Sequence, residues 1–378
     1  LESMADLVVG NNEKSRIADL VSRRFQERFP EAGIHVEDLT HCTVFEAQQI
    51  TRQTDHVRAY VKIQDGCNRF CSYCVIPYLR GRSRSRSVTD ILQESRALAA
   101  AGYQELVLTG IDISSFADPG LKQSAEKTSD TLTEITDEGM PLVELIGQLA
   151  EIPGIRRIRL GSLEAGIISD PLIRKLCGIS SFCPQFHLSL QSGCDSVLKR
   201  MNRHYTTDQY EKAVAIIRKH LPEAAITTDV ITGFPGETEE EFEQTMEFAE
   251  RIAFSRMHVF PYSRRKGTRA DLMPGQLSKA VKEERARRLI QKAELLRRAY
   301  EEQQIGRVCR ILVEDVVSRD GQHFLAGYTP EYVYILVRLS DPMEKPDRDA
   351  VVNQMLDVVP QVFQNGELIA FPAPGTEN

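Results

Sequence analysis

Six segments with the composition of β-strands alternate with helix-like segments, and this alternation restricts the possible folds more than any other feature of the sequence. The strand-like segments are residues 57–63, 105–108, 156–160, 185–190, 225–231 and 256–260. Strands that alternate with helices form parallel sheets. Six such units predict an α/β protein with an open, partial barrel rather than the closed barrel that eight units make.

The segments between these strands have apolar residues at helical spacing. Helices are expected at 88–101, 207–220 and 238–251, with Thr89 or Asp90 as the cap of the first and Gly102 as its end. Ser114 to Pro141 is long, polar and rich in hydroxyl groups. We interpret it as an exposed insertion, with a substrate lid as the alternative.

Shorter elements flank the alternating region. Before it, a strand at Ala5–Val9 and an amphipathic helix at Asn12–Phe29 precede a polar linker, Glu31–Arg52. After it, a charged helix at Leu277–Tyr300 leads into short strands at 308–317, 324–326 and 332–339, which predict a small all-β barrel. We therefore expect a remnant N-terminal α/β segment (1–52), a partial barrel (53–300) and a β domain (301–378).

Composition excludes several classes of protein. The chain of 378 residues has a formal net charge of -7, so RNA contact would need local basic patches. No apolar run approaches the roughly 20 residues that span a bilayer, and no signal peptide is visible. Eight cysteines in a chain of this length do not make a disulfide scaffold. A reducing cytoplasm is the expected location, with no membrane association.

Three cysteines, Cys67, Cys71 and Cys74, follow the first predicted strand with the spacing C-x3-C-x2-C. A loop at a strand's carboxyl end can wrap three thiolates around one inorganic centre. Structural zinc sites and ordinary four-iron ferredoxin clusters need four ligands. Three thiolates leave one iron open to bind a cofactor. The alternatives are three free thiols, or a zinc site completed by a distant residue such as Cys42.

This spacing, with Tyr73 before the last cysteine, resembles the radical S-adenosylmethionine (SAM) superfamily. The resemblance implies a [4Fe-4S] cluster whose open iron chelates SAM, and reductive cleavage of SAM to a 5′-deoxyadenosyl radical. It also implies a partial (β/α)6 barrel, which agrees with the six strands counted independently.

The segments Lys62–Asn68 and Val75–Arg86 resemble the methylthiotransferases, most closely the MtaB branch. That branch methylthiolates C2 of N6-threonylcarbamoyladenosine beside the tRNA anticodon. The resemblance runs from about Leu7 to about Leu339. It implies an ANN-decoding tRNA as substrate, flavodoxin or ferredoxin as electron donor, and a C-terminal RNA-binding barrel similar to the TRAM module.

Polar or small residues follow successive predicted strands, where they are suited to hold SAM. The resemblance and this placement together give these candidate cofactor-binding residues: Tyr73, Thr109, Gly110, Ser162, Glu164, Ser189, Gln191, Asp229, Gly233 and Phe260. Taken singly, each is as well explained as a strand-end cap or turn. Their recurrence after successive strands favours the binding interpretation.

Cations near the predicted active-site face are candidate RNA contacts. They are Arg80, Arg82, Arg84, Arg86, Arg200, Arg203, Arg264, Arg265 and Lys266, with Arg307, Arg310 and Arg338 in the β domain. An ordinary solvated surface is the alternative. For Arg200 and Arg203, pairing with the SAM carboxylate is a further alternative.

The resemblance also implies an N-terminal domain with three more cysteines, which hold a second [4Fe-4S] cluster that is thought to supply the sulfur. Only Cys42 precedes the cysteine triplet here, so we expect that domain to be truncated and the second cluster to belong to the intact protein. The other cysteines are Cys177, Cys183, Cys194 and Cys309. We expect them to be buried free thiols.

Three alternatives remain open at this stage. A sibling methylthiotransferase would act on isopentenyladenosine in tRNA or on a ribosomal protein aspartate. A non-catalytic RNA-binding protein would hold zinc or a structural cluster on its cysteines. An unrelated radical SAM enzyme would act on a small molecule.

Overall fold

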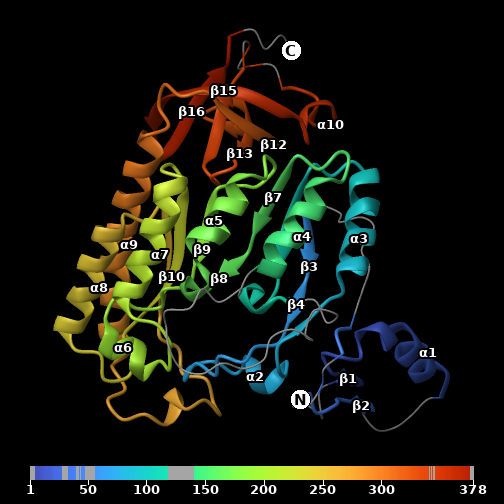
Figure 1. The fold of residues 1–378 in the computed structure, drawn as a ribbon, viewed down its shortest axis with the longest axis vertical. Coiled ribbons are helices and arrows are strands. Elements are labelled where there is room, and N and C mark those ends of the chain that lie inside the picture. The colour runs from blue at the N-terminus through green and yellow to red at the C-terminus, as the bar shows by residue number, and fades with distance from the viewer. Residues whose placement is uncertain are drawn as a thin grey trace.

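The computed structural model describes residues 5–27, 33–39, 42, 44–46, 56–117, 140–339, 341, 343 and 345–374. A large α/β barrel occupies the centre of the molecule, the C-terminal β domain lies at one end, and a small N-terminal unit lies beside the other end (Figure 1). Most of the insertion predicted at Ser114–Pro141 lies outside the described residues, so its interpretation stays a prediction.

The central barrel is a continuous series of parallel strands. They are β3 (Ala59–Lys62), β6 (Glu105–Thr109), β7 (Arg157–Leu160), β8 (Ser162–Leu163), β9 (Gln185–Leu188), β10 (Ala225–Thr232) and β11 (Arg256–Pro261). β8 continues β7 after a break at Gly161, so β7 pairs with β6 while β8 pairs with β9. No pairing among the described residues joins β3 to β11. This confirms the prediction of a six-stranded partial barrel.

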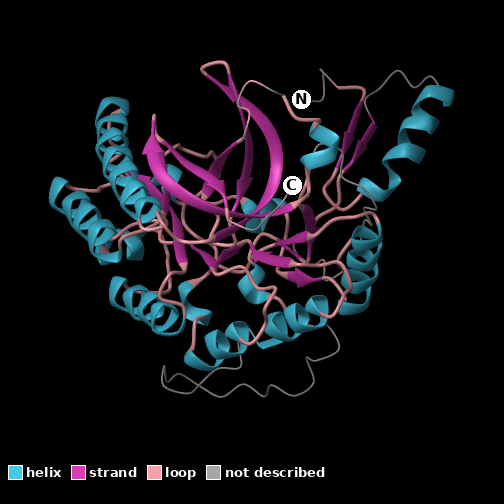
Figure 2. Cartoon of the chain, turned by 90° about the horizontal axis from the view of Figure 1, so that it is seen from above, coloured by secondary structure: helices cyan, strands magenta, loops and turns pink. Residues whose placement is uncertain are grey.

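Helices cover the outside of this barrel (Figure 2). They are α3 (Val88–Ala100), α4 (Met140–Ala150), α5 (Asp170–Cys177), α6 (Asp195–Arg200), α7 (Thr207–His220), α8 (Glu239–Ile252) and α9 (Lys279–Glu302). Their apolar faces and the strands bury one large hydrophobic core. The predicted cap of α3 was wrong, because Ser87 caps this helix by accepting from the amide of Asp90 at 3.1 Å. No helix within the described ranges is long and apolar enough to cross a membrane.

The N-terminal unit contains β1 (Leu7–Val9), a 3-10 turn (Lys14–Arg16), α1 (Ile17–Glu27) and β2 (Gly33–His35). β1 and β2 are parallel, so the linker predicted to begin at Glu31 is wrong at β2. Two β-strands in sequence proximity and a helix between them form a βαβ unit, which agrees with the predicted α/β segment. Leu39, after β2, is buried.

The C-terminal domain is a closed five-stranded barrel with its own hydrophobic core. Its strands are β12 (Cys309–Arg319), β13 (Gln322–Tyr328), β14 (Tyr334–Arg338), β15 (Met355–Gln364) and β16 (Glu367–Pro372), with a short α10 (Arg348–Val351) before β15. The predicted compact β barrel is confirmed, although the sequence reasoning assigned only its first three strands. Closure of the barrel leaves no free sheet edge.

Two buried arginines attach the C-terminal barrel to the amino ends of the central strands. Arg157 donates to the carbonyls of Tyr328 (2.7 Å) and Arg310 (2.6 Å), and Arg159 donates to those of Pro330 (2.7 Å) and Thr329 (3.1 Å). Both also pair with Glu105, which is fully buried. The loop between β13 and β14 therefore closes the end of the central barrel that is opposite the carboxyl ends of its strands.

Arg159→Ala should destabilise the protein by about 3–5 kcal/mol, because it leaves the Glu105 carboxylate buried with one partner fewer and removes the donor to the Pro330 carbonyl and one of the two donors to the Thr329 carbonyl. Urea unfolding measures the change. Arg156→Ala is the matched control, since its neighbouring side chain is exposed. Equal unfolding free energies for the two variants would contradict this account.

Candidate functional site

The three predicted cluster cysteines lie in one loop at the carboxyl end of β3. A short hairpin of β4 (Gln64–Asp65) and β5 (Arg84–Ser85) brackets this loop and the helix α2 (Ile76–Leu79) within it. All three cysteines are free thiols of intermediate exposure. No three metal-ligating side chains in the described chain are placed to share one ion. A four-iron cluster binds each thiolate through a different iron, so its ligands need not converge on one ion.

Gln64, on β4, fixes the start of the cysteine loop by hydrogen bonds to the loop itself and to the turn after β6. Its side-chain amide donates to the carbonyl of Gly66 at 2.8 Å, and its oxygen accepts from the amides of Ile111 (3.0 Å) and Asp112 (2.8 Å). The side chain is fully buried, so these bonds have no competition from water. Gln64 therefore ties the loop after β3 to the turn after β6.

Gly66 is required by the close approach of the two arms of the hairpin. Its φ is +73°, and a Cβ at this position would lie 2.0 Å from the carbonyl oxygen of Arg82. Only glycine adopts this backbone conformation without strain, and only glycine leaves room for that carbonyl. The next amide, that of Cys67, donates to the carbonyl of Gly81 at 3.1 Å.

The chain after α6 holds the loop from the other side. The amide of Ser72 donates to the carbonyl of Met201 (2.9 Å), and the Ser72 hydroxyl donates to that of Arg200 (2.9 Å). The Asn202 side chain donates to the carbonyl of Phe70 at 2.9 Å. Residues 200–202 therefore have a clear structural role, which is to clamp the backbone on both sides of Cys71.

Burial and hydrogen bonds have opposite effects on the pKa values of the cysteine thiols. Burial raises the pKa of Cys67 to about 11 and also raises the pKa of Cys74. The backbone amide of Arg69 donates to the sulfur of Cys67 at 3.4 Å and stabilises its thiolate. Since thiolates are the ligands of iron, a cluster bound here would displace protons from the thiols. The partly exposed sulfurs and the N–H donors that surround them fit a [4Fe-4S] cluster.

The predicted cofactor-binding residues divide into two groups in the structure. Glu164 and Ser189 come together, because both contact the guanidinium of Arg203, Glu164 with its two oxygens at 2.7 Å and Ser189 with its carbonyl at 3.3 Å. Gln191 has a φ of +67° and its amide donates to the carbonyl of Asp229 at 2.9 Å. Glu164, Ser189 and Gln191 follow the ends of β8 and β9, whereas Asp229 lies within β10, three residues before its end.

The remaining candidates are more dispersed. Tyr73 packs its ring against Phe234 (centroids 6.4 Å apart). Thr109 and Gly110 end β6 beside Gln64, Ser162 is exposed, and Phe260 is exposed at the end of β11. Gly233 was expected to approach a ligand. Its close neighbour in the structure is Lys282 of α9, whose Cγ would lie 2.5 Å from a Cβ at this position.

Four of the arginines predicted to contact RNA are paired with carboxylates of the protein, and three of them are buried. Arg84 and Arg86 are buried and pair with Asp65 and Glu94. Arg200 pairs with Glu241 at 2.6 Å, and Arg203 is buried against Glu164. In this arrangement their guanidinium groups are held by carboxylates, so RNA contact by these four residues does not fit the structure. The alternation of arginine with small residues does not distinguish an RNA-binding surface from a buried hairpin. It equally suits the two-stranded hairpin that packs Arg84 and Arg86 inward.

The other predicted cations are more accessible. Arg80 reaches Asp65 at 3.4 Å, and Arg264 pairs with Asp271 at 2.8 Å. Arg82, Arg265 and Lys266 are exposed and have no carboxylate partner among the described residues. In the C-terminal barrel Arg307 pairs with Glu223, Arg310 pairs with Asp357, and Arg338 lies over the ring of Phe371.

Two imidazoles inside the barrel were missed by the sequence reasoning. His187 on β9 lies 3.3 Å from the Asp229 carboxylate and 3.1 Å from the Thr227 hydroxyl, and its ring is 6.3 Å from that of His258. Burial lowers the pKa of His258. The alternation of side chains along β9, β10 and β11 could have predicted this cluster. Side chains two residues apart in a strand share a face, so His187 lies on the same face as Ser189.

Two of the cysteines expected to be buried are not. Cys183 and Cys194 are buried, Cys309 is half-buried and Cys177 is exposed. Cys177 is the last residue of α5, where its side chain faces away from the barrel core. Cys42 accepts from the Asn12 side chain at 3.4 Å.

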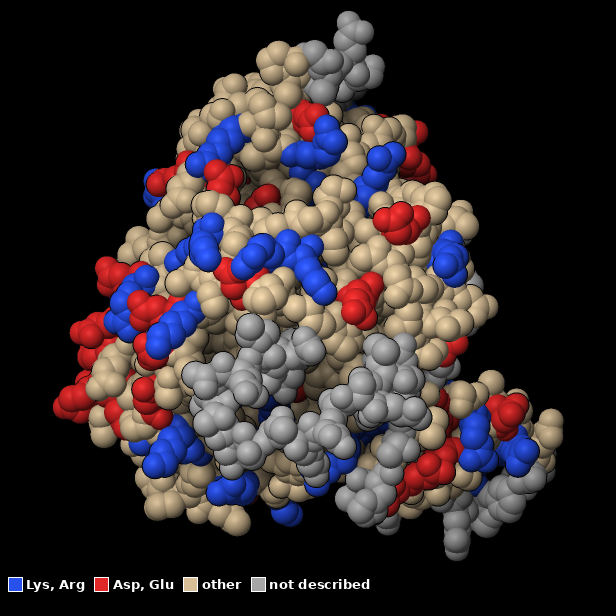
Figure 3. Space-filling view, viewed as in Figure 1, with Lys and Arg blue, Asp and Glu red and all other residues tan. Residues whose placement is uncertain are grey.

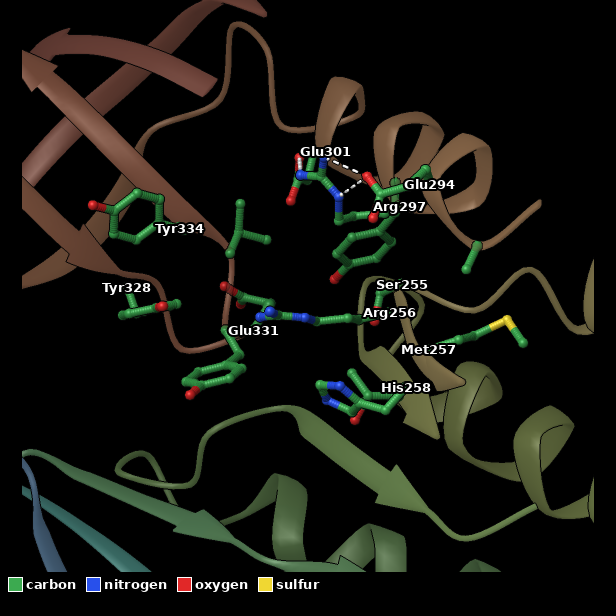
Figure 4. Close-up of a pocket in the computed structure, with 15 residues that line it drawn as sticks. Ser255, Arg256, Met257, His258, Glu294, Arg297, Glu301, Tyr328, Glu331 and Tyr334 are labelled. Carbon is green, nitrogen blue, oxygen red and sulfur yellow. Dashed lines mark hydrogen bonds and ion pairs between the residues drawn. The ribbon is translucent and has the colours of Figure 1, made fainter. Parts of the chain in front are cut away.

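A cavity of about 440 Å³ lies at the junction between the central barrel and the C-terminal barrel. Arg256 and His258 line it from the start of β11, and Tyr328, Glu331 and Tyr334 line it from the C-terminal barrel (Figure 4). The cysteine loop is at the opposite ends of the strands. This cavity is therefore separate from the SAM site that the cysteines predict.

Comparison with known proteins agrees with this geometry. A profile of the Radical SAM superfamily matches residues 61–249. Threonylcarbamoyladenosine tRNA methylthiotransferase MtaB of Bacillus subtilis (strain 168) is 35% identical over 340 residues, which are 89% of this chain and 71% of that protein. tRNA-2-methylthio-N(6)-dimethylallyladenosine synthase of Caldicellulosiruptor saccharolyticus is 38% identical over 291 residues, 77% of this chain and 58% of that protein. The chain thus spans 71% and 58% of the length of these two relatives.

The solved structures that were found resemble this chain only distantly. The radical S-adenosylmethionine methyltransferase TsrM from Kitasatospora setae has a TM-score of 0.44 and 16% identity over 57% of this chain and 38% of that chain. A likeness of this size has no bearing on function.

The partial barrel, with three cysteines after its first strand and polar groups at the following strand ends, defines a radical SAM enzyme. The two relatives, which are both named as enzymes that form methylthio groups on tRNA, indicate the family within this class. The chain belongs to the radical SAM methylthiotransferase family.

Gln64→Ala should weaken the cysteine loop, because it leaves the Ile111 and Asp112 amides and the Gly66 carbonyl without this partner. Each buried group left unsatisfied costs roughly 1–3 kcal/mol. We expect lower stability in urea and a lower iron content after anaerobic reconstitution. Gln209→Ala is the control, since Gln209 only completes the capping box of α7. Full iron content in Gln64→Ala would show that the loop does not need this bond.

Acid should weaken the contact between α6 and α8. The hydrogen bond from Arg200 lowers the pKa of Glu241 to about 2. A lowered folded-state pKa stabilises the fold above the ordinary value of 4.5, and this stabilisation is lost as the pH falls towards 2. Because the pair is partly exposed, its contribution is about 1 kcal/mol at most. Urea unfolding at pH 6 and pH 3 should show a smaller pH dependence in Arg200→Gln than in the wild type.

Proposed function

We propose that this chain acts as a radical SAM tRNA methylthiotransferase, which adds a methylthio group to C2 of N6-threonylcarbamoyladenosine beside the anticodon. The observation that carries the proposal is the triplet Cys67, Cys71 and Cys74, clamped at the carboxyl end of β3 in a chain whose relatives are tRNA methylthiotransferases. An ANN-decoding tRNA is the expected substrate.

A second candidate substrate has independent support. The relative named for threonylcarbamoyladenosine is 35% identical, and the relative named for dimethylallyladenosine is 38% identical. These values are too close to separate the two modified adenosines. The isopentenyl (dimethylallyl) nucleoside is therefore the alternative substrate of the same reaction.

The chain's own residues supply the setting for SAM cleavage. A cluster on the three cysteines would supply one electron to SAM and so generate a 5′-deoxyadenosyl radical. Glu164 and Ser189 lie at neighbouring strand ends and Asp229 lies within β10, and their oxygens can accept hydrogen bonds from the ammonium and ribose groups of SAM. On the side of β13 and β14, Arg157 and Arg159 join the barrel to the C-terminal domain by hydrogen bonds. A flavodoxin or ferredoxin is the proposed electron donor, and a second [4Fe-4S] cluster is the proposed source of sulfur.

RNA would approach the end of the molecule that carries the cysteine loop. Arg82, Arg265 and Lys266 are exposed there, and Arg82 lies over the ring of Phe70 at 4.5 Å. Phe260 offers an exposed aromatic surface at the end of β11. Lys and Arg side chains are visible along this lower edge, near α2 and α6 (Figure 3). Cations with aromatic rings suit an unpaired RNA loop, in which phosphates and splayed bases are both accessible.

The double substitution Arg265→Gln with Lys266→Gln should weaken tRNA binding, because two phosphate contacts are removed. The slope of log K against log salt should fall by about 1–2. Fluorescence anisotropy at several salt concentrations measures both quantities. Lys212→Gln is the control, since Lys212 is equally exposed but lies on α7, away from the loop. Unchanged slopes in the double variant would remove this face from the RNA interface.

The function itself is tested with anaerobically reconstituted protein, dithionite, SAM and tRNA that carries one of the two modified adenosines. We expect 5′-deoxyadenosine to form in the wild type and to be abolished in Cys71→Ala. Mass spectrometry of digested tRNA then identifies the modified nucleoside. A product only from isopentenyladenosine would select the alternative. Zinc without sulfide in the purified protein would overturn the radical reaction.

A further inference from the structure

Arg203 is the one predicted RNA contact that reaches a cluster cysteine. Its Nη1 lies 3.3 Å from the sulfur of Cys71, while its Nη2 contacts both oxygens of Glu164 at 2.7 Å. Its Nε donates to the Tyr205 hydroxyl at 3.2 Å. The side chain is only 5% exposed, so the guanidinium is withdrawn from solvent and from any RNA.

The surroundings of Arg203 leave it little freedom to move. The Tyr205 hydroxyl is held by the carbonyls of Ser189 (2.7 Å) and Leu190 (2.6 Å), and the guanidinium lies 4.9 Å from the centre of the Tyr205 ring. A planar guanidinium donates along fixed directions, which a lysine cannot reproduce. With Glu164 on one side and Tyr205 on another, the remaining N–H is aimed at Cys71.

A fixed cation beside a thiolate ligand changes the energy of the cluster. Reduction adds one negative charge to the cluster, and a nearby cation or N–H donor stabilises the reduced form more than the oxidised form. Glu164 has the opposite effect, since its negative charge partly neutralises Arg203. The two groups therefore have opposite charges. Arg203 contacts the sulfur directly, and Glu164 contacts Arg203 but not the sulfur.

We propose that Arg203 is a positioning residue for the radical SAM cluster, which orients Cys71 and raises the reduction potential of the cluster, and that Glu164 fixes Arg203 and moderates this effect. The proposal rests on the cluster of the proposed function but not on any RNA substrate. It also explains how the strand ends of β8 and β9 are linked to the cysteine loop through a single side chain.

The reduction potential of the reconstituted cluster, measured without SAM or tRNA, tests the proposal. Arg203→Gln should lower the potential, so that the ratio of reduced to oxidised cluster at a fixed potential near the midpoint falls about tenfold, which is about 59 mV for one electron. Arg203→Lys should have a potential between those of the wild type and Arg203→Gln, because it keeps the positive charge and loses the planar guanidinium that donates in several directions. Glu164→Gln should shift the potential in the opposite direction.

Arg200→Gln is the matched control for these variants. Arg200 is three residues away in the same segment and is also paired with a glutamate, Glu241, but its guanidinium contacts no cluster cysteine. Its substitution should leave the potential unchanged. A residue that only supported the fold would not shift the potential in opposite directions when Arg203 and Glu164 are changed. Unchanged potentials in both variants, at wild-type iron content, would overturn the proposal.

A second measurement uses the wild type and so does not depend on a variant that folds. Protein labelled with ¹⁵N only in the arginine guanidinium should show a weak ¹⁵N coupling to the reduced cluster in pulsed EPR. The coupling should be lost in Arg203→Lys and kept in Arg200→Lys. Absence of the coupling in the wild type would overturn the proposal. Absence of iron from the wild type would instead overturn the proposed function.

Discussion

Gln64 and the segment after α6 hold the cysteine loop from opposite sides, and the chemistry of the site depends on this double clamp. Gln64 links the loop to the turn after β6, and Met201 and Asn202 link it to the chain that follows β9. A loop of this kind has little regular hydrogen bonding of its own, so its backbone polar groups must find partners elsewhere. The parallel barrel supplies them because all its strands end on the same side.

The same barrel has different tasks at its two ends. At the carboxyl ends, short polar residues surround the cysteines and one buried arginine, Arg203, contacts Cys71. At the amino ends, Arg157 and Arg159 bind carbonyls of the C-terminal barrel and close the lumen. Both arrangements use guanidinium groups with buried carboxylate partners, Glu164 in one and Glu105 in the other. Pairing makes it possible for such groups to be buried without a large loss of stability.

The predictions from sequence succeeded where the signal was local. The six strands, α7 and the three cysteines required only alternation, helical period and spacing, and α7 was placed at the observed bounds, Thr207–His220. The prediction for Gly33–His35 failed because that strand is three residues long and pairs with a strand 26 positions earlier. The strands β15 and β16 were not assigned, although they pair with each other as a hairpin whose turn, Asn365-Gly366, is a local sequence signal that was overlooked.

The sequence by itself determined that this chain is a parallel α/β protein with a three-cysteine loop after its first barrel strand, because periodicity and spacing are properties of neighbouring residues. Only the tertiary structure decided what the arginines do. From their residue type and position in the sequence, Arg84, Arg86 and Arg203 could belong to an RNA-binding surface. In the structure each has a carboxylate partner inside the fold, at Asp65, Glu94 and Glu164 respectively. A charge's role depends on which partner lies within a few ångströms and on whether water can reach it, and both are set by packing rather than by sequence order.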